Sequence, residues 1–407
     1  MAAEAAVTAE AVAATAAVTD RAAPGTVVRW PRRSYHRDVR PRGCLLQPSD
    51  FFSATYAEAR RRFLDAAAQA GFASEHHANP AKGPDGGALA TDVVRIGPAD
   101  APRVLLTLSA THGVEGFCGS GAQVGTLRAG LWRDLPADTA LVMVHAINPY
   151  GFAWLRRVTE DNVDLNRNHV DHDAPYPQNP GYVALREHIC PRAWDDAARA
   201  EATRNLHAYA DEHGWMALQQ AISGGQHVDP TGVFFGGTAP TWSARTLYRI
   251  VEQHAAGADH VAVIDYHTGL GPYGYGELIG DGPAGDPGRE RLKHWLGDEV
   301  TATDDGSSTS APLTGCNDVG IRNHLPSGTS LTMVTLEYGT SPVEEVLDSL
   351  RADAWLHAHG DLASGQGKAI KAEIRRCFYP DADDWKAMVW ERAVETQAKM
   401  LAGLASL

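Results

Sequence analysis

The chain lacks the cysteine pattern of a disulfide-stabilised or thiolate-zinc protein. Its 407 residues hold five cysteines, an odd number without any CxxC pair: Cys44, Cys118, Cys190, Cys316 and Cys377. A disulfide framework uses even numbers of cysteines, and structural zinc sites use closely spaced thiolates, so the sequence argues against both. A reducing, cytoplasmic environment fits this cysteine usage best.

Long hydrophobic runs and an excess of positive charge are also missing. No window approaches the ~18 apolar residues of a membrane span, so no membrane partner is predicted. The net charge is −14, and the only arginine-rich stretch is residues 27–43. We interpret that stretch as a solvated arm, and we predict no nucleic-acid partner.

The N-terminal residues 1–43 are predicted to be a low-complexity, flexible tail. The first 25 residues are rich in alanine and lack a positively charged start, which argues against a signal peptide. Beyond them we find neither an internal repeat nor a Pro/Gly/Ser-rich linker. Residues 44–407 are therefore predicted to form a single domain.

Strand-like and helix-like segments alternate through this domain. Short apolar segments predict strands, and segments with helical apolar spacing predict helices. Because the strands are short and continuously apolar, the pattern indicates an α/β fold with a mainly parallel mixed sheet covered by helices on both faces. The predicted strands are 91–97, 103–109, 140–148, 260–267 and 331–339, and the predicted helices are 49–71, 120–132, 193–221, 242–254 and 343–359.

Unusual polar residues follow or close the predicted strands. His112 and Glu115 come after 103–109, and Asn148, His267 and Glu337 stand at the ends of three others. Sites in parallel sheets form at the carboxyl ends of the strands. We therefore expect these side chains to gather at one edge of the sheet.

His112, Glu115 and His267 together form a donor set suited to a catalytic metal. Two imidazoles and one carboxylate are a common three-ligand set for zinc, with the fourth position left to water. The alternative is that HxxE arises by chance and that His112, one of 18 histidines, has a structural or surface role.

Charged groups interrupt the bulky residues of the stretch 148–168. An arginine fork suits a carboxylate, and an arginine beside a polarised carbonyl stabilises an oxyanion. The alternative for each arginine is a surface ion pair of little energetic value. The charged and amide residues in question are Arg156, Arg157, Asp164, Asn166 and Arg167.

The ordered motifs HGVE, NPYGF…RRVTEDNVDLNRN, DYHTG and TLEYGT resemble the zinc carboxypeptidase family over about residues 100–345. DLNRN with its preceding arginine resembles the cytosolic carboxypeptidase branch, and the fuller wording is similar to an uncharacterised bacterial branch. The motif set is also similar to aspartoacylase and succinylglutamate desuccinylase. The resemblance implies a metallocarboxypeptidase-like catalytic domain that uses Zn²⁺.

Carried over by position, the resemblance makes His112, Glu115 and His267 the zinc ligands and Asp164 the carboxylate that orients the first histidine. Such a carboxylate fixes the ring and its tautomer.

The resemblance assigns the remaining roles to four residues, one of which has a rival. It implies that Asn166 and Arg167 hold a free substrate carboxylate, and that Glu337 is the general base and acid. Arg157 matches the oxyanion arginine by spacing, with Arg156 as its adjacent rival. Glu337 read alone could instead be a capping or ion-paired residue at a strand end. Tyr273, Tyr275 and Tyr338 do not match the family's tyrosine position, so no catalytic tyrosine is assigned.

The predicted function is a zinc-dependent amide or peptide hydrolase that removes a residue bearing a free carboxylate. Its expected partner is a small peptide or an acylated amino acid. Two alternatives stay open: an N-acyl-amino-acid deacylase of the aspartoacylase type, and a non-catalytic metal- or ligand-binding module.

Overall fold

A computed structural model of the chain describes residues 46–280 and 282–407. These residues belong to one compact unit, Leu46–Leu407. The predicted tail 1–43, its arginine-rich stretch and the predicted domain start at residue 44 lie outside the described residues.

An eight-stranded mixed sheet organises the unit, in the order β1-β2-β4-β3-β5-β8-β6-β7. The central strands β4, β3, β5 and β8 run parallel, while β1, β2 and β6 pair antiparallel with their neighbours and β7 pairs parallel with β6. The strands are β1 Ser74–Lys82, β2 Ala88–Ile96, β3 Arg103–Leu108, β4 Thr139–His145, β5 His260–Tyr273, β6 Gly276–Gly280, β7 Val300–Thr301 and β8 Ser330–Gly339.

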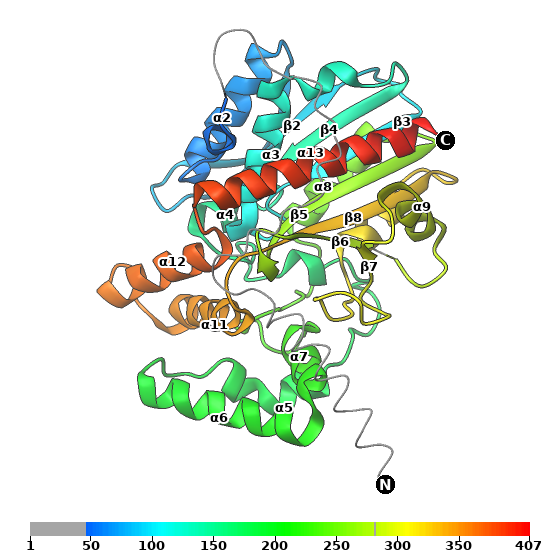
Figure 1. Cartoon of the computed structure of the whole chain (residues 1–407). Coiled ribbons are helices and arrows are strands. Elements are labelled where there is room, and N and C mark those ends of the chain that lie inside the picture. The colour runs from blue at the N-terminus through cyan, green and yellow to red at the C-terminus, as the bar shows by residue number, and fades with distance from the viewer. Residues whose placement is uncertain (1–45, 281) are drawn as a thin grey trace. The chain divides into compact units, whose positions relative to one another are not determined.

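Helices cover both faces of this sheet (Figure 1). The α-helices are α2 Tyr56–Gln69, α3 Gly116–Ala129, α4 Pro149–Trp154, α5 Pro180–Ile189, α6 Asp196–His213, α7 Trp215–Ser223, α8 Trp242–His254, α9 Pro287–Leu296, α10 Asn317–His324, α11 Val343–His359, α12 Gly365–Phe378 and α13 Asp383–Ala405. Four short 3₁₀ helices accompany them: η1 Pro48–Phe51, η2 Gly113–Glu115, η3 Leu131–Asp134 and η4 Leu165–Arg167. Among the described residues, none of these helices has both the length and the apolar character needed to cross a membrane.

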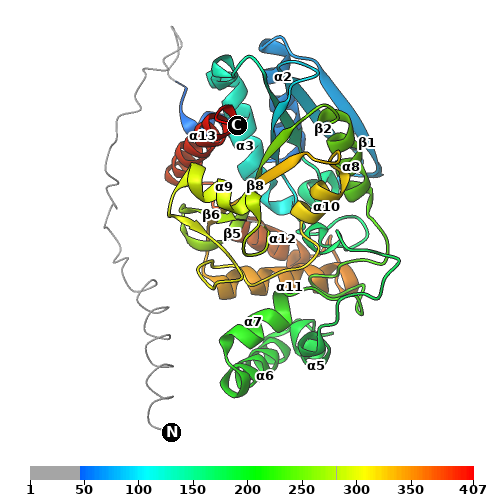
Figure 2. The same cartoon turned by 90° about the vertical axis from the view of Figure 1, so that its right-hand side faces the viewer.

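The buried strand residues divide between two hydrophobic cores because side chains alternate along a strand. In β3, Leu105 joins the core beneath α2, α3 and α13, while Leu106 and Leu108 join the core beneath α8 and α10. Figure 2 shows α3 and α13 on one side of the sheet and α8 and α10 on the other. The predicted α/β fold, with a mainly parallel mixed sheet covered on both faces, is confirmed.

Three local predictions need correction. The helix predicted over 49–71 begins later, because Thr55 caps α2 through a hydrogen bond from the Glu58 amide, and Pro48–Phe51 form a separate 3₁₀ turn. The single helix predicted over 193–221 is two helices, α6 and α7, because Gly214 takes a φ of 92° between them. The strand β5 continues six residues beyond its predicted end at His267, to Tyr273.

Candidate active site

A turn after β3 presents His112 and Glu115. Ala110 takes a φ of 60° directly after the strand, an uncommon conformation for a residue with a side chain. Its carbonyl oxygen accepts a hydrogen bond from the Asn148 amide, which ties this turn to the end of β4. His112 then caps η2, and Glu115 ends it, so both side chains leave the same tight turn.

His267 lies within β5 and not at its end, which corrects the prediction, and Glu337 lies two residues before Gly339, where β8 ends as predicted. They are paired in register on the neighbouring parallel strands β5 and β8. Val261 and Val263 of β5 face the core beneath α8 and α10, and alternation puts His267 on the same face. Beyond Thr268 the register of β5 shifts, and its backbone departs from β8 beside the site.

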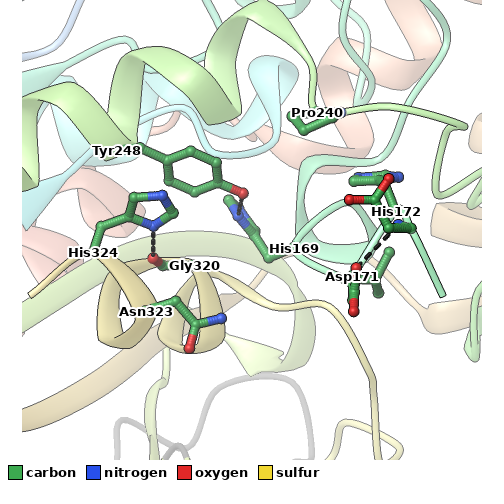
Figure 3. A pocket seen from close by; sticks show the side chains of 10 residues that line it. His169, Asp171, His172, Pro240, Tyr248, Gly320, Asn323 and His324 are labelled. Atoms are coloured by element: carbon green, nitrogen blue, oxygen red, sulfur yellow. Dashed lines mark hydrogen bonds between the residues drawn. The ribbon is translucent and has the colours of Figure 1, made fainter.

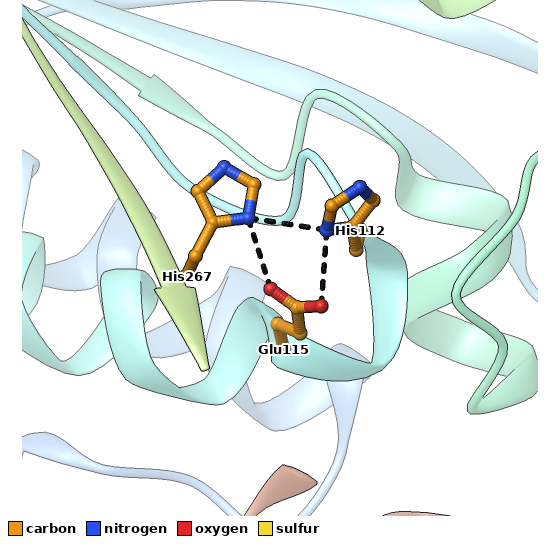
Figure 4. A group of neighbouring side chains, drawn as sticks. All are labelled: His112, Glu115 and His267. Carbon is orange, nitrogen blue, oxygen red and sulfur yellow. Dashed lines mark hydrogen bonds and ion pairs between the residues drawn. The ribbon is translucent and has the colours of Figure 1, made fainter. Parts of the chain in front are cut away.

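The structure brings His112, Glu115 and His267 together (Figure 4). The His112 Nδ1 atom lies 3.0 Å from Glu115 Oε1, and His267 Nδ1 lies 3.1 Å from Glu115 Oε2. The two Nδ1 atoms are 3.1 Å apart. All three side chains are buried, so four polar atoms converge on one point inside the protein.

This arrangement fits a zinc ion. Ligands bound tetrahedrally at 2.0–2.1 Å lie about 3.3 Å from each other, close to the spacing of these atoms. Each imidazole also turns its other nitrogen to a carboxylate: His112 Nε2 lies 3.2 Å from Asp164 Oδ1, and His267 Nε2 lies 3.0 Å from Asp265 Oδ2. Carboxylates placed in this way orient metal-binding histidines and make them stronger donors.

Asp265 was not anticipated from the sequence. It is fully buried, accepts a hydrogen bond from the Thr111 hydroxyl at 2.8 Å, and stands two residues before His267. Residues two apart in a strand share a face. The D-x-H spacing in a predicted strand therefore indicated that Asp265 lies on the same face as His267.

The structure separates the two adjacent arginines. Arg157 donates through Nε to Asp164 Oδ2 at 2.8 Å and through Nη1 to Glu115 Oε1 at 3.2 Å. Arg156 turns away and pairs with the buried Asp353 at 2.9 Å. Arg157 therefore lies next to the cluster of His112, Glu115 and His267, and Arg156 does not.

Asn166 and Arg167 lie beside this group on η4. Arg167 donates to the backbone oxygens of Ser223 and Asn166, and among the described residues it forms no ion pair with a carboxylate. The Asn166 Oδ1 atom accepts a hydrogen bond from the main-chain amide of Asn317 at 3.0 Å. That contact does not involve the side-chain nitrogen of Asn166. The guanidinium groups of Arg157 and Arg167 both lie over the Phe234 ring, at 5.2 and 5.6 Å from its centroid.

The charges in this cluster shift each other's ionisation. Although burial opposes the effect, His112 and His267 hold the pKa of Glu115 below its usual range, and Arg157 does the same for Asp164. Burial also disfavours a charged His267, but Asp265 and Glu115 raise its pKa well above the usual value.

Glu337 behaves in the opposite way. Burial and the nearby charge of Glu115 raise the pKa of Glu337 to about 8. Its Oε1 atom accepts a hydrogen bond from the Leu270 amide at 3.0 Å, which fixes the carboxyl group. A carboxyl group with a pKa near neutrality can both take and return a proton.

A separate cavity lies beside Tyr248 and His324 (Figure 3). Its lining includes His169, whose Nδ1 contacts the Tyr248 hydroxyl and whose Nε2 contacts Asn317 Oδ1 at 2.7 Å. Asn317 in turn donates to Asp265 Oδ2 at 2.8 Å. Asn317 therefore connects the wall of this cavity with the carboxylate behind His267, but none of the residues that converge in Figure 4 lines the cavity.

A family model described as "Protein of unknown function (DUF2817)" matches residues 52–392. The chain belongs to the DUF2817 family. This agrees with the predicted resemblance to an uncharacterised branch, and all the predicted site residues of the DUF2817 chain fall inside the match. No curated protein matches the chain.

Solved structures similar to the DUF2817 chain include three named proteins. Carboxypeptidase A from Helicoverpa armigera is 13% identical, with 81% of this chain and 74% of that chain covered and a TM-score of 0.40. An aspartoacylase family protein from Mesorhizobium loti is 14% identical, with coverage of 71% and 67% and a TM-score of 0.34. Murein-tripeptide amidase MpaA from Escherichia coli O157 is 16% identical, with coverage of 71% and 90% and a TM-score of 0.32.

The convergence of His112, Glu115 and His267 predicts metal binding. Elemental analysis of the purified DUF2817 protein should find about one zinc per chain, and His112→Ala and His267→Ala should each lose nearly all of it. The largely buried His254, which contacts Glu75, supplies the control, and His254→Ala should keep its zinc. Full zinc retention in both ligand variants would refute the assignment.

The tight turn between the two ligand residues predicts a second effect. A Cβ atom on Gly113 would lie 2.0 Å from the backbone carbon of Gly151 in α4, so Gly113→Ala must displace the turn. We expect a loss of about 1–3 kcal/mol in the free energy of unfolding, together with weaker zinc binding. Gly257→Ala is the control, because its nearest atom would lie 3.9 Å away. Denaturant titration and zinc competition would measure both effects, and wild-type values for Gly113→Ala would contradict the proposed packing.

Proposed function

We propose that this DUF2817 protein is a zinc-dependent amide hydrolase that cleaves a residue bearing a free carboxylate, in the manner of a carboxypeptidase. The observation that carries the proposal is the pairing of His267 with Glu337 in register on adjacent strands. This pairing sets a fixed carboxyl group of raised pKa beside a converged two-histidine, one-carboxylate donor set.

His112, Glu115 and His267 would hold the metal, with Asp164 and Asp265 behind the two imidazoles. Zinc at such a site lowers the pKa of a water molecule toward neutrality and polarises a carbonyl group. With a metal bound, each histidine would carry its proton on Nε2, on the side of its carboxylate, and offer its Nδ1 lone pair to the metal.

Glu337 is the proposed proton carrier. Because the Leu270 amide holds Oε1, Oε2 is the oxygen left to take a proton from the attacking water and return it to the leaving amine. The two steps need the same carboxyl group first as a base and then as an acid.

The two arginines have different proposed tasks. Arg157 uses Nε and Nη1 for Asp164 and Glu115, and its Nη2 is proposed to donate to the carbonyl oxygen as that oxygen gains charge. Arg167 has backbone oxygens as its hydrogen-bond partners. Together with the Asn166 amide, Arg167 is proposed to bind the free carboxylate of the substrate.

Removing the charge of Glu337 tests the mechanism. Glu337→Gln keeps the shape of the side chain, so it should bind zinc and substrate about as well as wild type while kcat falls at least about a hundredfold. Exposed Glu344 offers a matched control, and Glu344→Gln should turn over normally. Turnover would be measured on N-acyl dipeptides and N-acyl amino acids together with zinc content. Wild-type turnover in Glu337→Gln would disprove its role, and loss of zinc would make Glu337 a ligand.

Substrate orientation gives another test. If Arg167 reads a free carboxylate, converting that carboxylate to an amide should lower kcat/KM about ten- to a hundredfold, because a charge-assisted contact contributes roughly 1.5–3 kcal/mol. Arg167→Lys keeps the positive charge but loses the two-point contact of the guanidinium group. It should therefore reduce the ratio of kcat/KM for the acid to kcat/KM for the amide. Equal rates for acid and amide in the wild-type enzyme would contradict the proposal.

A further inference from the structure

The side chain of Asn317, the first residue of α10, joins the two segments that carry the histidines of the cluster. Its Nδ2 atom donates to the Thr111 hydroxyl at 3.0 Å and to Asp265 Oδ2 at 2.8 Å. Thr111 directly precedes His112, and Asp265 stands two residues before His267. One amide group thus connects the turn after β3 with the strand β5.

The hydrogen-bonded pairing of β3 with β5 ends before either histidine. The last paired residues are Leu108 of β3 and Asp265 of β5. Beyond them the chain leaves β3 for the turn that carries His112, whereas β5 continues past His267 beside β8. Contacts other than this pairing therefore set how far apart the two imidazoles lie.

The contacts of Asn317 close a ring of hydrogen bonds at this point. The Thr111 hydroxyl, which accepts a hydrogen bond from Asn317, itself donates to Asp265 Oδ1 at 2.8 Å. All three side chains are fully buried, so the loss of any one of these bonds would leave a polar group without a partner in the interior. The ring therefore holds the turn after β3 against β5.

The orientation of the Asn317 amide is fixed from its other side. Its Oδ1 atom lies 2.7 Å from His169 Nε2, and His169 Nδ1 lies 2.9 Å from the Tyr248 hydroxyl, a contact drawn in Figure 3. Burial lowers the pKa of His169 to about 4, so the neutral ring donates through Nε2 and accepts through Nδ1. If the amide were reversed, its oxygen would face the Asp265 carboxylate, and two acceptors would meet.

We propose that Asn317 is a positioning residue for the metal site. Its amide group holds Thr111 against Asp265 and thereby sets the spacing of the two ligand nitrogens. The Nδ1 atoms of His112 and His267 are 3.1 Å apart, close to the ~3.3 Å that two tetrahedral ligands of one zinc ion require. This inference rests on the metal site of the proposed function and adds the residue that gives that site its geometry.

The zinc affinity of folded variants tests the inference. Asn317→Leu keeps the approximate size of the side chain but removes the amide donor from Thr111 and Asp265. Competition with a chromophoric chelator should therefore show zinc binding at least about tenfold weaker than in wild type. The Co²⁺-loaded variant should also have shifted d–d absorption bands, because these bands report the ligand geometry. Asn323→Leu is the matched control, since Asn323 is exposed on the same helix, and it should bind zinc like wild type.

The hydroxyl group in the ring gives an independent test. Thr111→Val keeps the shape of the side chain but removes the hydroxyl group that links Asn317 to Asp265, whereas Thr111→Ser keeps that group. The valine substitution should weaken zinc binding at least about tenfold, and the serine substitution should not. If Asn317→Leu does not fold, this pair decides the proposal.

The outcomes separate the role of Asn317 from the hydrolase function. Wild-type zinc affinity in folded Asn317→Leu would overturn the role, even if the free energy of unfolding falls, because a merely structural residue would change only that free energy. Equal zinc affinities of Thr111→Val and Thr111→Ser would also overturn it. If the wild-type protein binds zinc but cleaves neither N-acyl dipeptides nor N-acyl amino acids, the hydrolase function fails and the zinc affinities still decide the role of Asn317. If the wild-type protein binds no zinc, both proposals are overturned.

Discussion

Four acidic side chains are buried close together in this site, and the repulsion between their charges is its main physical constraint. Glu115, Asp164, Asp265 and Glu337 surround the two histidines, and Arg157 is the cation that hydrogen-bonds within this group. Repulsion between carboxylates is strong where water is excluded. Burial and this repulsion raise the pKa of Glu337, and His112, Glu115 and His267 converge at a point where a divalent cation would offset the negative charge.

The sheet supplies the geometry that these charges need. Parallel pairing sets His267 of β5 beside Glu337 of β8, and antiparallel pairing sets Glu277 of β6 on the other side of Glu337. The three residues therefore form one row across the sheet. The remaining donors come from a turn whose conformation is unusual. Ala110, Asn162 and Phe234 all have positive φ values next to residues of the site, and residues in such conformations tend to be held in place by their surroundings. The strands thus set the spacing within the row, and the turns direct the other side chains toward it.

Much of this arrangement could be predicted from the sequence because strand patterns carry it. The apolar run before His112 and the strand ending near His267 indicated where a parallel sheet would bring polar side chains together, and the structure does bring His112, Glu115 and His267 together. The alternation of side chains along β5 also indicated that Asp265 shares a face with His267, but Asp265 was not predicted as a site residue. The order of the strands was not encoded locally, so the row from His267 to Glu277 could not be foreseen, because it depends on a pairing between β6 and β8.

Other features depended on tertiary contacts. Arg156 and Arg157 are equivalent in the sequence, and only the packing of Asp353 against Arg156 distinguishes them. The start of α2 was misplaced because Ser49, Asp50 and Thr55 are all suitable caps, and the 3₁₀ turn at Pro48–Phe51 left the role to Thr55. The strand β1 was missed entirely. Its sequence, SEHHANPAK, is mostly polar and lacks the alternation of polar and apolar residues that indicates a strand.

The turn that carries His112 and Glu115 is fastened by main-chain hydrogen bonds to the segment that carries the arginines. The Gly113 amide donates to the Arg157 carbonyl at 3.1 Å, and the Val114 amide donates to the Arg156 carbonyl at 2.8 Å. Neither bond involves a side-chain atom of the cluster, so main-chain contacts also fix the position of this turn. In small zinc domains, by contrast, the free energy of metal binding is the free energy of folding. In this chain the turn has main-chain anchors outside the cluster, so the positions of His112 and Glu115 depend on the packing of residues 156 and 157 as well as on what their side chains bind.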